Sequence, residues 1–391
     1  MKKATLLFLL MTFSVPGWLL AQNPTIQTII SEVNIDTLLF RAEEISGERG
    51  VVVNGVTDTI KSRHKSKPGN ELCYDFLIQK LASFGLQTDS LLFGTVGKNA
   101  LAVQTGMLYP NQYYIVCAHY DDMPNATVAP AADDDGSGVS TVMEAARILS
   151  NYQFEYTIIY ALWDEEEQGL AGSSAYASLA NTNNDSLRGV LNLDAIAFDS
   201  DNDNAAMIHT NNNSLAVSVA VDNVNTTYAL GLDLTIQNPG ATYSDHASFW
   251  TNGFPAVLLI EDWTFDSNPN YHTVNDRVMY FNVPYYEKMS KLAVASIATM
   301  AVPYTSTSVA EEEKNSYSLY PNPVSDALFI RSDNKYPVTG AEICDISGRV
   351  LAQYAVKSNA ISLDVSQLPE GLYFVRLLSE RGQEVMRFVK K

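Results

Sequence analysis

The sequence predicts an α/β protein: a three-layer α/β/α domain with a mostly parallel, mixed central sheet, followed by a small all-β sandwich. Between residues 22 and 303, apolar runs of strand length alternate with helical stretches, as in sheets covered by helices on both faces. After residue 316 only short alternating runs separated by turn residues follow. The 391 residues, of which 46% are hydrophobic and 18% charged, suffice for two or three packed domains.

Residues 1–21 are typical of a secretory signal peptide. Lys2 and Lys3 precede an apolar run that ends near Ala21, and this run is short for a membrane span. We expect cleavage after Ala21 and no membrane span in the mature chain. An uncleaved membrane anchor is the alternative.

Residues 22–303 are expected to form the α/β domain. Helical spacing of apolar residues predicts a helix over 26–46, and Asn70 can cap a second helix that ends before Gly85. Buried strands are predicted over 99–103, 113–118, 156–162, 189–193 and 256–260, with helices over 138–150 and 173–179 between them.

Residues 317–391 are expected to form the β-sandwich, after a polar linker over 304–316. Strands are predicted over 326–331, 341–346, 361–365, 372–377 and 384–389, with turns at Ser347-Gly348 and Pro369-Glu370-Gly371. The strand pattern alone also fits a sugar-binding or adhesion module.

The charge of the chain excludes one class of partner. There are 25 Lys and Arg against 44 Asp and Glu, a net charge of −19, and the whole excess falls between residues 22 and 316, because both ends of the chain are mildly basic. A nucleic-acid binder needs a basic face, so we expect no nucleic-acid partner. Docking on anionic lipid is disfavoured for the same reason.

Polar side chains follow the predicted strands at their carboxyl ends. His119 and Asp121 end one strand, Glu165–Glu167 follow another, Asp194 follows a third, and Asp133–Asp135 precede a helix. In such sheets these ends meet at one edge, where so many carboxylates would repel one another unless cations bind. Imidazole and carboxylate ligands suit zinc, with cobalt or manganese as alternatives.

Each of these features alone has a plainer explanation. A single His at a strand end is often structural, Glu165–Glu167 fit a solvated loop, and Asp133–Asp135 fit a helix cap. Ser244-Asp245-His246 has the composition of a catalytic triad, but adjacent residues diverge in direction and no G-x-S-x-G segment is present.

Taken together and in order, five segments resemble the co-catalytic zinc aminopeptidase family. Its members include secreted bacterial leucine aminopeptidases, and its relatives include glutamate carboxypeptidases and glutaminyl cyclases. The resemblance covers roughly residues 70–300. The segments are HYDD (119–122), AADDDGSG (131–138), DEEEQGLAGS (164–173), NLDA (192–195) and YSDHASFW (243–250).

The resemblance implies two zinc ions per chain and a ligand set for them. Asp134 would bridge both ions, His119 and Asp194 would complete one site, and Glu167 and His246 would complete the other. It also implies that the Asp134–Asp135 peptide bond is cis.

The resemblance also implies the residues around the metals. Glu166 would be the general base, and Asp121 would orient the His119 imidazole. Tyr243 and His272 are possible pocket residues: Tyr243 for the oxyanion, and His272 because His272–Asp276 resembles a later family segment, His-Thr-x-x-Asp. A structural His is the alternative for His272.

We therefore expect a zinc-dependent aminopeptidase that removes N-terminal residues from peptides through a metal-bridging hydroxide, with Glu166 as the general base. The alternatives are a glutaminyl cyclase or carboxypeptidase of the same superfamily, and a non-catalytic surface binding protein with a degenerate site. A carboxypeptidase needs a basic group for the substrate carboxylate, and Arg147, Arg188 and Arg277 are candidates.

The C-terminal segment resembles the sorting domain of type IX secretion substrates. The resemblance rests on YPNPVSDALFI (320–330), DISGRVL (345–351), LPEGLYFVRL (368–377) and a basic end. It implies export through the periplasm and the outer membrane to a secreted or cell-surface location, with the type IX secretion machinery as partner. A permanent binding module is the alternative.

Three further features have no place in this site. Asp199, Asp201 and Asp203 have the spacing of a calcium loop, but Asn204 stands where an EF-hand needs Gly, so we expect a solvated acidic loop. Cys73 and Cys117 are expected to be buried free thiols, although a disulfide between them stays open. His64 and His209 match no segment and are expected at the surface.

Overall fold

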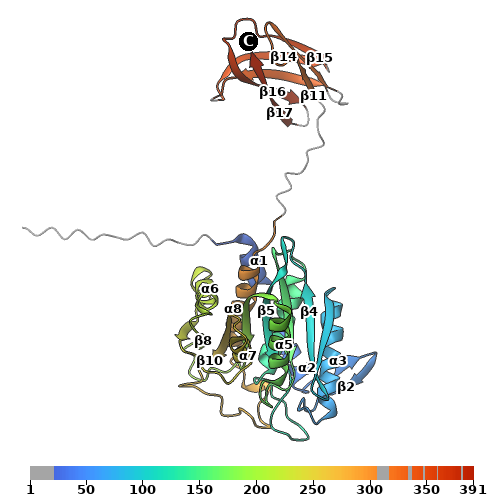
Figure 1. Ribbon diagram of the computed structural model, residues 1–391, viewed down its shortest axis with the longest axis vertical. Helices are drawn as coiled ribbons and strands as arrows, with labels where there is room; N and C mark the ends of the chain where they lie inside the picture. The colour runs from blue at the N-terminus through green and yellow to red at the C-terminus, as the bar shows by residue number, and fades with distance from the viewer. Residues whose placement is uncertain (1–21, 306–316, 333–336, 347, 359, 380–381) are drawn as a thin grey trace, which may run out of the picture. The chain divides into compact units, whose positions relative to one another are not determined.

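The computed structural model describes residues 22–305 and, of the C-terminal part, 317–391 except 333–336, 347, 359 and 380–381 (Figure 1). The predicted signal peptide and residues 306–316 of the predicted linker lie outside the described residues. The chain divides into two compact units after Thr305, and each is described by itself. The limits given above for the four segments stay predictions.

An eight-stranded mixed sheet forms the middle of the first unit. The strand order is β3-β4-β6-β5-β7-β10-β8-β9, and four of the seven neighbouring pairs are parallel. The strands are β3 (Gln87–Phe93), β4 (Gly97–Gln104), β5 (Tyr109–His119), β6 (Tyr156–Trp163), β7 (Ser186–Leu193), β8 (Ala205–His209), β9 (Asp233–Gln237) and β10 (Ala256–Glu261).

Helices bury both faces of this sheet. Along β6, Ile158, Tyr160 and Leu162 enter one hydrophobic core, whereas Ile159, Ala161 and Trp163 enter a second core on the opposite face, because side chains alternate along a strand. The first core also receives α4 (Gly136–Leu149) and α8 (Val283–Ala301), and the second receives α5 (Ala171–Asn183) and α7 (His246–Thr251). The predicted three-layer architecture is confirmed.

The remaining elements of this unit lie around the same framework. They are α1 (Pro24–Glu32), α2 (Ile35–Ile45), the hairpin of β1 (Val51–Val53) and β2 (Val56–Asp58), α3 (Pro68–Ser83), α6 (Leu215–Thr227) and the 3₁₀ helix η1 (Val278–Tyr280). None of the helices within the described residues combines the length and apolarity that crossing a bilayer requires.

The single helix predicted over 26–46 is wrong, because the chain forms α1 and α2 there. Val33 between them is extended, with ψ of 121°. The Asn34 side chain then caps α2 by accepting a hydrogen bond from the Thr37 N–H at 2.9 Å, and the Asn34 N–H donates to Glu144 at 3.0 Å. The apolar spacing continues across this break, which is why periodicity alone does not reveal it.

Two antiparallel sheets make up the second unit. One contains β11 (Tyr317–Tyr320), β12 (Ala327–Ser332) and β15 (Ala360–Asp364), and the other β14 (Val350–Ser358), β13 (Val338–Cys344), β16 (Gly371–Ser379) and β17 (Gly382–Lys390). Leu328 and Leu363 from the first sheet share a core with Val375 and Phe388 from the second. The predicted β-sandwich is confirmed.

The four central strands of the large sheet position the candidate site. β6, β5, β7 and β10 are neighbours and run parallel, so their carboxyl ends meet at one edge. The segments that follow these strands carry most of the acidic and imidazole side chains described next.

Candidate metal centre

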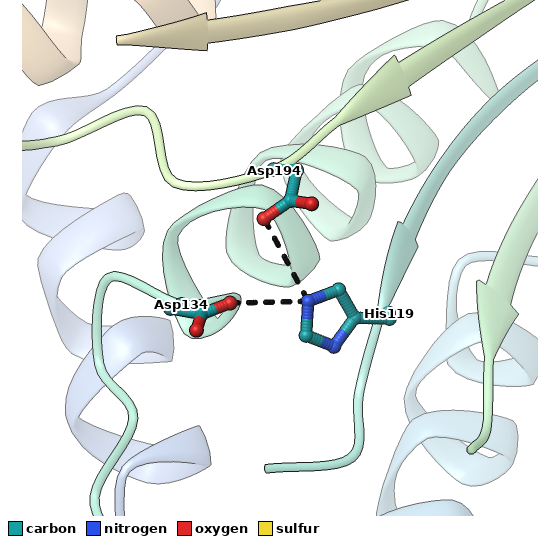
Figure 2. A group of neighbouring side chains, drawn as sticks. All are labelled: His119, Asp134 and Asp194. Atoms are coloured by element: carbon teal, nitrogen blue, oxygen red, sulfur yellow. Dashed lines mark hydrogen bonds and ion pairs between the residues drawn. The ribbon is translucent and has the colours of Figure 1, made fainter. Parts of the chain in front are cut away.

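His119, Asp134 and Asp194 form a compact group at this edge (Figure 2). His119 is the last residue of β5, Asp134 precedes α4, and Asp194 directly follows β7. The His119 Nε2 atom lies 3.1 Å from Asp134 Oδ1 and 3.7 Å from Asp194 Oδ1. All three residues are buried. The structure therefore brings together three of the residues that the sequence assigns to one metal site.

A second group shares Asp134 with the first. The other carboxylate oxygen of Asp134, Oδ2, lies 3.1 Å from the Nε2 atom of His272. That nitrogen is in turn 2.9 Å from Glu167 Oε1. The two oxygens of Asp134 thus face two different groups of possible ligands, as a carboxylate between two metal ions would.

His272 takes the place that the sequence assigns to His246. The structure does not bring His246 to Glu167: its ring begins α7, donates from Nε2 to the Ala241 carbonyl at 2.8 Å and packs edge-on against Trp250. His246 is therefore not among the described residues whose ligand atoms gather around Glu167, although its Nδ1 atom is buried without a hydrogen-bond partner. Burial lowers the pKa of His246 to about 4, so the ring is neutral.

Asp121 lies behind His119, as predicted. Its Oδ1 is 3.4 Å from His119 Nδ1. The same carboxylate accepts hydrogen bonds from the main-chain N–H groups of Glu166 at 3.0 Å and Glu167 at 3.2 Å. One side chain therefore bonds the acidic segment after β6 and lies next to the His119 imidazole.

Two further carboxylates hold the loop that presents Asp134. Asp135 accepts from the N–H groups of His119 at 3.2 Å and Gly138 at 2.9 Å. Asp276 accepts from the N–H groups of Asp133 at 3.1 Å and Asp134 at 3.0 Å. The Asp134–Asp135 peptide bond is cis, as the resemblance implies.

The Asp276 contact is the signal that identifies His272. Asp276 comes four residues after His272, in the segment His272–Asp276. Because Asp276 bonds the main chain of Asp134, it fixes the His272 loop next to that carboxylate. Asp276 was not assigned a role from the sequence.

The electrostatics show how strongly these groups interact. Burial raises the pKa of Glu166 well above its usual range, and burial together with the Asp134 charge raises the pKa of Glu167 to about 7. Burial would also raise the pKa of Asp134, but contacts with His119 and His272 outweigh it and hold that pKa well below the usual range. A site with this much repulsion between acids favours bound positive charge.

The donor atoms fit metal ions. Glu167 Oε1, His272 Nε2 and His119 Nδ1 are buried and, among the described residues, make no geometrically acceptable hydrogen bond, although each has a polar neighbour close by. Buried polar atoms left unpaired are costly. Imidazole nitrogen and carboxylate oxygen are the ligands that zinc binds in proteins, and the two groups share Asp134 as two neighbouring sites would.

A cavity of about 480 Å³ opens onto both groups. Glu166 and Tyr243 line it beside His119, Asp134 and Asp194. Elsewhere the wall is largely apolar and aromatic, with contributions from Leu170, Ile260, Trp263 and Tyr271. Both residues predicted for the pocket therefore lie at the site. Tyr243 lines the cavity, and the His272 Nε2 atom lies next to Asp134 and Glu167.

Two predictions for other histidines are wrong. His64 and His209, expected at the surface, are 9% and 6% exposed. His209 ends β8 and is covered by the segment that contains Ala241, whose N–H bonds its ring. Nothing in the sequence around His209 indicates this contact, because it joins residues 32 positions apart.

The acidic loop and the two cysteines singled out in the sequence lie outside the two ligand groups. Asp199, Asp201 and Asp203 offer oxygens within 4.8 Å of one another, but each accepts a hydrogen bond from a main-chain N–H of the same loop, so the loop's own bonds account for its shape. Cys73 and Cys117 are free and buried.

Two family models match this chain. Residues 99–297 match the model described as Peptidase family M28, and residues 318–391 match the one described as Secretion system C-terminal sorting domain. Because the first match spans half of the chain, the protein belongs to peptidase family M28, and it ends in a secretion sorting domain.

Named relatives support the same family. A probable leucine aminopeptidase of Arthroderma benhamiae is 29% identical over 198 residues, covering 48% of this chain and 54% of the relative. A probable zinc metalloprotease of Pyrenophora teres f. teres is 27% identical over 188 residues, covering 41% and 39%. The chain thus spans about half the length, or less, of these curated relatives.

Solved structures share the fold. The LapA aminopeptidase of Legionella pneumophila aligns with a TM-score of 0.60 at 21% identity, covering 71% of this chain and 75% of that one. A glutaminyl cyclase of Porphyromonas gingivalis aligns with a TM-score of 0.56 at 18% identity, covering 69% and 99%. At these identities the likeness concerns the fold alone.

Proposed function

We propose that this protein is an exported aminopeptidase that uses two zinc ions to hydrolyse the N-terminal peptide bond of peptides. The observation that carries the proposal is the position of Asp134, whose two carboxylate oxygens face two separate ligand groups. Membership of peptidase family M28 supports hydrolysis of a peptide bond as the reaction, and the curated relatives named as aminopeptidases support the exopeptidase class.

The proposed ligand set differs from the sequence-based one at a single position. His119 and Asp194 would hold one ion, Glu167 and His272 the other, and Asp134 would bridge them. Zinc fits this donor set best, and cobalt or manganese could replace it. When bound, the two ions would lower the pKa of a water molecule and polarise the scissile carbonyl.

Glu166 is the proposed general base. It lines the cavity, its carboxylate lies within 4.8 Å of ligand atoms of His119 and Glu167, and its main-chain N–H donates to Asp121. A group that takes a proton from water and passes it to the leaving amine needs a pKa nearer neutrality than that of an exposed Glu. Burial moves the pKa of Glu166 in that direction.

The cavity lining favours an aminopeptidase over a carboxypeptidase. Neither Lys nor Arg lines the cavity within the described residues, so the carboxylate of a substrate would lack a charged partner there. Two of the arginines considered from the sequence bond elsewhere: Arg147 with Glu144, and Arg277 with Glu48. An α-ammonium group, by contrast, suits a cavity rich in acids.

A glutaminyl cyclase remains the second candidate, because a protein of that activity shares the fold. The two differ in metal stoichiometry, since cyclases of this superfamily use one zinc ion. His119 lies within 3.7 Å of both Asp134 and Asp194. These three residues favour a complete metal site in addition to that of Glu167 and His272, and therefore hydrolysis.

The export route is proposed from both ends of the chain. The basic start and apolar run of residues 1–21 would direct the chain into the periplasm, and the sorting domain would direct it through the type IX machinery. The mature protein would then act outside the cell or on its surface.

A substrate panel tests the proposed reaction. Purified protein should cleave chromogenic aminoacyl amides and free-amino peptides but not N-acetylated peptides, and a chelator should abolish turnover until zinc is restored. Metal analysis should give two ions per chain. Cleavage of acetylated peptides would contradict the aminopeptidase class, and absence of both metal and turnover would favour a binding protein.

Glu166→Gln tests the proposed base. The amide keeps the size of the side chain but cannot take a proton, so we expect kcat to fall about a thousandfold or more. Two zinc ions and the melting temperature of the wild type should be retained. Near-normal turnover in this variant would remove Glu166 from the mechanism.

A further inference from the structure

His209 lies beside the cavity without lining it. Its ring packs edge-on against that of Tyr243, with 5.7 Å between ring centroids, and its Nε2 lies 3.2 Å from the Tyr243 hydroxyl oxygen. Tyr243 does line the cavity and is 47% exposed. The buried His209 is thus one hydrogen bond away from a side chain that a substrate would meet.

The surroundings of His209 fix which ring nitrogen carries the proton. Its Nδ1 atom accepts a hydrogen bond from the Ala241 N–H at 3.0 Å. A neutral imidazole has one accepting and one donating nitrogen, so the proton must be on Nε2. Burial lowers the pKa of His209, which keeps the ring in this neutral form.

The tautomer then fixes the direction of the Tyr243 hydroxyl. Because Nε2–H donates to the Tyr243 oxygen, the hydroxyl proton itself is free to point away from His209, towards the cavity. Burial and the nearby Asp194 charge raise the pKa of Tyr243 to about 12, so the group is a neutral donor at ordinary pH.

The loop around this contact is closely packed. The Gly240 N–H donates to the Thr210 carbonyl at 2.8 Å, and a Cβ atom on Gly240 would lie only 2.7 Å from His209 Cβ and Thr210 N. The segment that carries Ala241 therefore lies directly on the end of β8, which keeps Ala241 and His209 in register.

We propose that His209 is a positioning residue, which holds the Tyr243 hydroxyl as a hydrogen-bond donor into the cavity, where it meets the oxygen of the scissile carbonyl as negative charge develops. The inference rests on the proposed peptidase function. Donors preset at an oxyanion are effective because they need no reorganisation during the reaction. His209 itself does not line the cavity, and its bonds within the described residues are to Ala241 and Tyr243 and not to a proposed metal ligand.

Two conservative variants separate this role from a merely structural one. The amide of His209→Gln can still donate at the position of Nε2, whereas the carbonyl of His209→Asn can still accept from Ala241 N–H at the position of Nδ1. We expect His209→Asn to lower kcat about tenfold with little change in KM, and His209→Gln to retain most of the wild-type kcat. The reverse order would assign His209 to loop stability and overturn the proposal.

A double-mutant cycle tests whether His209 acts through Tyr243. Tyr243→Phe alone should lower kcat by about tenfold to a hundredfold. His209→Asn added to Tyr243→Phe should lower kcat no further, because the hydroxyl to be positioned is absent. Full additivity of the two effects would overturn the proposal. Metal content and melting temperature are measured for every variant, and each kcat is compared at two zinc ions per chain.

Nitrogen NMR of histidine-labelled protein gives a readout that does not depend on turnover. In the wild-type protein His209 should be protonated on Nε2 only, and its Nε2 signal should shift in Tyr243→Phe. A proton on Nδ1 would overturn the proposal even in an active enzyme. Failure to cleave any aminoacyl substrate would instead contradict the proposed function, while the NMR result would still decide the direction of the hydrogen bond.

Discussion

His246 and His272 show what sequence order leaves open at the scale of single residues. Each lies in a segment that resembles the same family: His246 in YSDHASFW and His272 in HTVND. The choice between them depends on ring direction, which is set by Asp276 bonding Asp134 in one case and by the Ala241 carbonyl in the other. Those contacts join residues 142 and 5 positions apart, and no local pattern encodes the first of them.

Metal content distinguishes the two histidines. His272→Ala removes a proposed ligand, so we expect the purified variant to hold fewer than two zinc ions and to lose most turnover. His246→Gln keeps a donor for the Ala241 carbonyl and should still bind two ions. The measurement is elemental analysis after dialysis against a weak chelator. A His272→Ala variant with two tightly bound ions would contradict the revised ligand set.

His246 also makes a prediction about acid stability. Its folded-state pKa is about 4, below the ordinary value of 6.5, so the unfolded chain takes up a proton first as the pH falls. The contribution of neutral His246 to the free energy of unfolding is fully present above pH 6.5 and is lost progressively between pH 6.5 and about 4. It amounts to roughly 3 kcal/mol.

The test compares His246→Gln with the wild type. Urea unfolding between pH 7.5 and 4.5 should show a smaller loss of unfolding free energy in the variant, because Gln does not titrate. Chelator is included in both samples so that the metal ligands titrate equally. Parallel curves for the two proteins would show that His246 does not contribute to the acid sensitivity.

At the scale of elements, the fold was more predictable than the loops. All five predicted strands of the large sheet exist, since strands such as β5 and β6 contain a long apolar run, over 113–118 and 158–163. Three strands were not predicted: the edge strands β3 and β9, in which polar and apolar residues are mixed, and the inner strand β8, which has only five residues. The α1–α2 break was missed for the reason given above, namely a cap within an unbroken apolar period.

Arg63 is an element-scale feature that the sequence did not reveal. It is fully buried. Its guanidinium donates to the carbonyls of Tyr120, Ile45, Pro130 and Ala131 at 2.6 to 2.8 Å. It therefore joins three segments: α2, the end of β5 and the loop before Asp133.

Arg63→Met should destabilise the first unit. The variant removes the Arg63 donor from the Tyr120, Ile45 and Pro130 carbonyls and one of two donors from the Ala131 carbonyl, so we expect a loss of about 3 kcal/mol or more in unfolding free energy. Arg49→Met is the matched control: Arg49 is exposed and bonds Glu43 at the surface, and its loss should cost no more than about 0.5 kcal/mol. Denaturant unfolding measures both. Equal effects would contradict the role of Arg63.

At the scale of the whole molecule, the two units have separate cores. The buried residues of the second unit form a cluster of their own, and both ligand groups lie entirely within the first unit. The acidic excess of the chain belongs to the first unit as well, where Asp134, Glu166, Glu167 and Asp194 are part of the candidate site. Composition and segment order were enough to predict two separately packed units.

Removal of the second unit should affect export and not chemistry. A chain that ends at Thr305 should keep the metal content and kcat of the full-length protein, because all proposed site residues precede that position. Expressed in a bacterium with type IX secretion, it should accumulate in the periplasm instead of the medium or cell surface. Fractionation and activity assays check both outcomes, and a folded but inactive truncated chain would contradict this separation.

The carboxylates that hold the candidate site bond mainly to the backbone. Asp121, Asp135 and Asp276 all accept hydrogen bonds from main-chain N–H groups of neighbouring loops. Such bonds do not depend on which side chains the loops carry. Substitutions in the cavity wall, at Leu170, Ile260 or Trp263, can therefore accumulate while the frame beneath them stays in place. Substrate preference is thus free to diverge among related sequences, or to be redesigned, without rebuilding the centre that performs the chemistry.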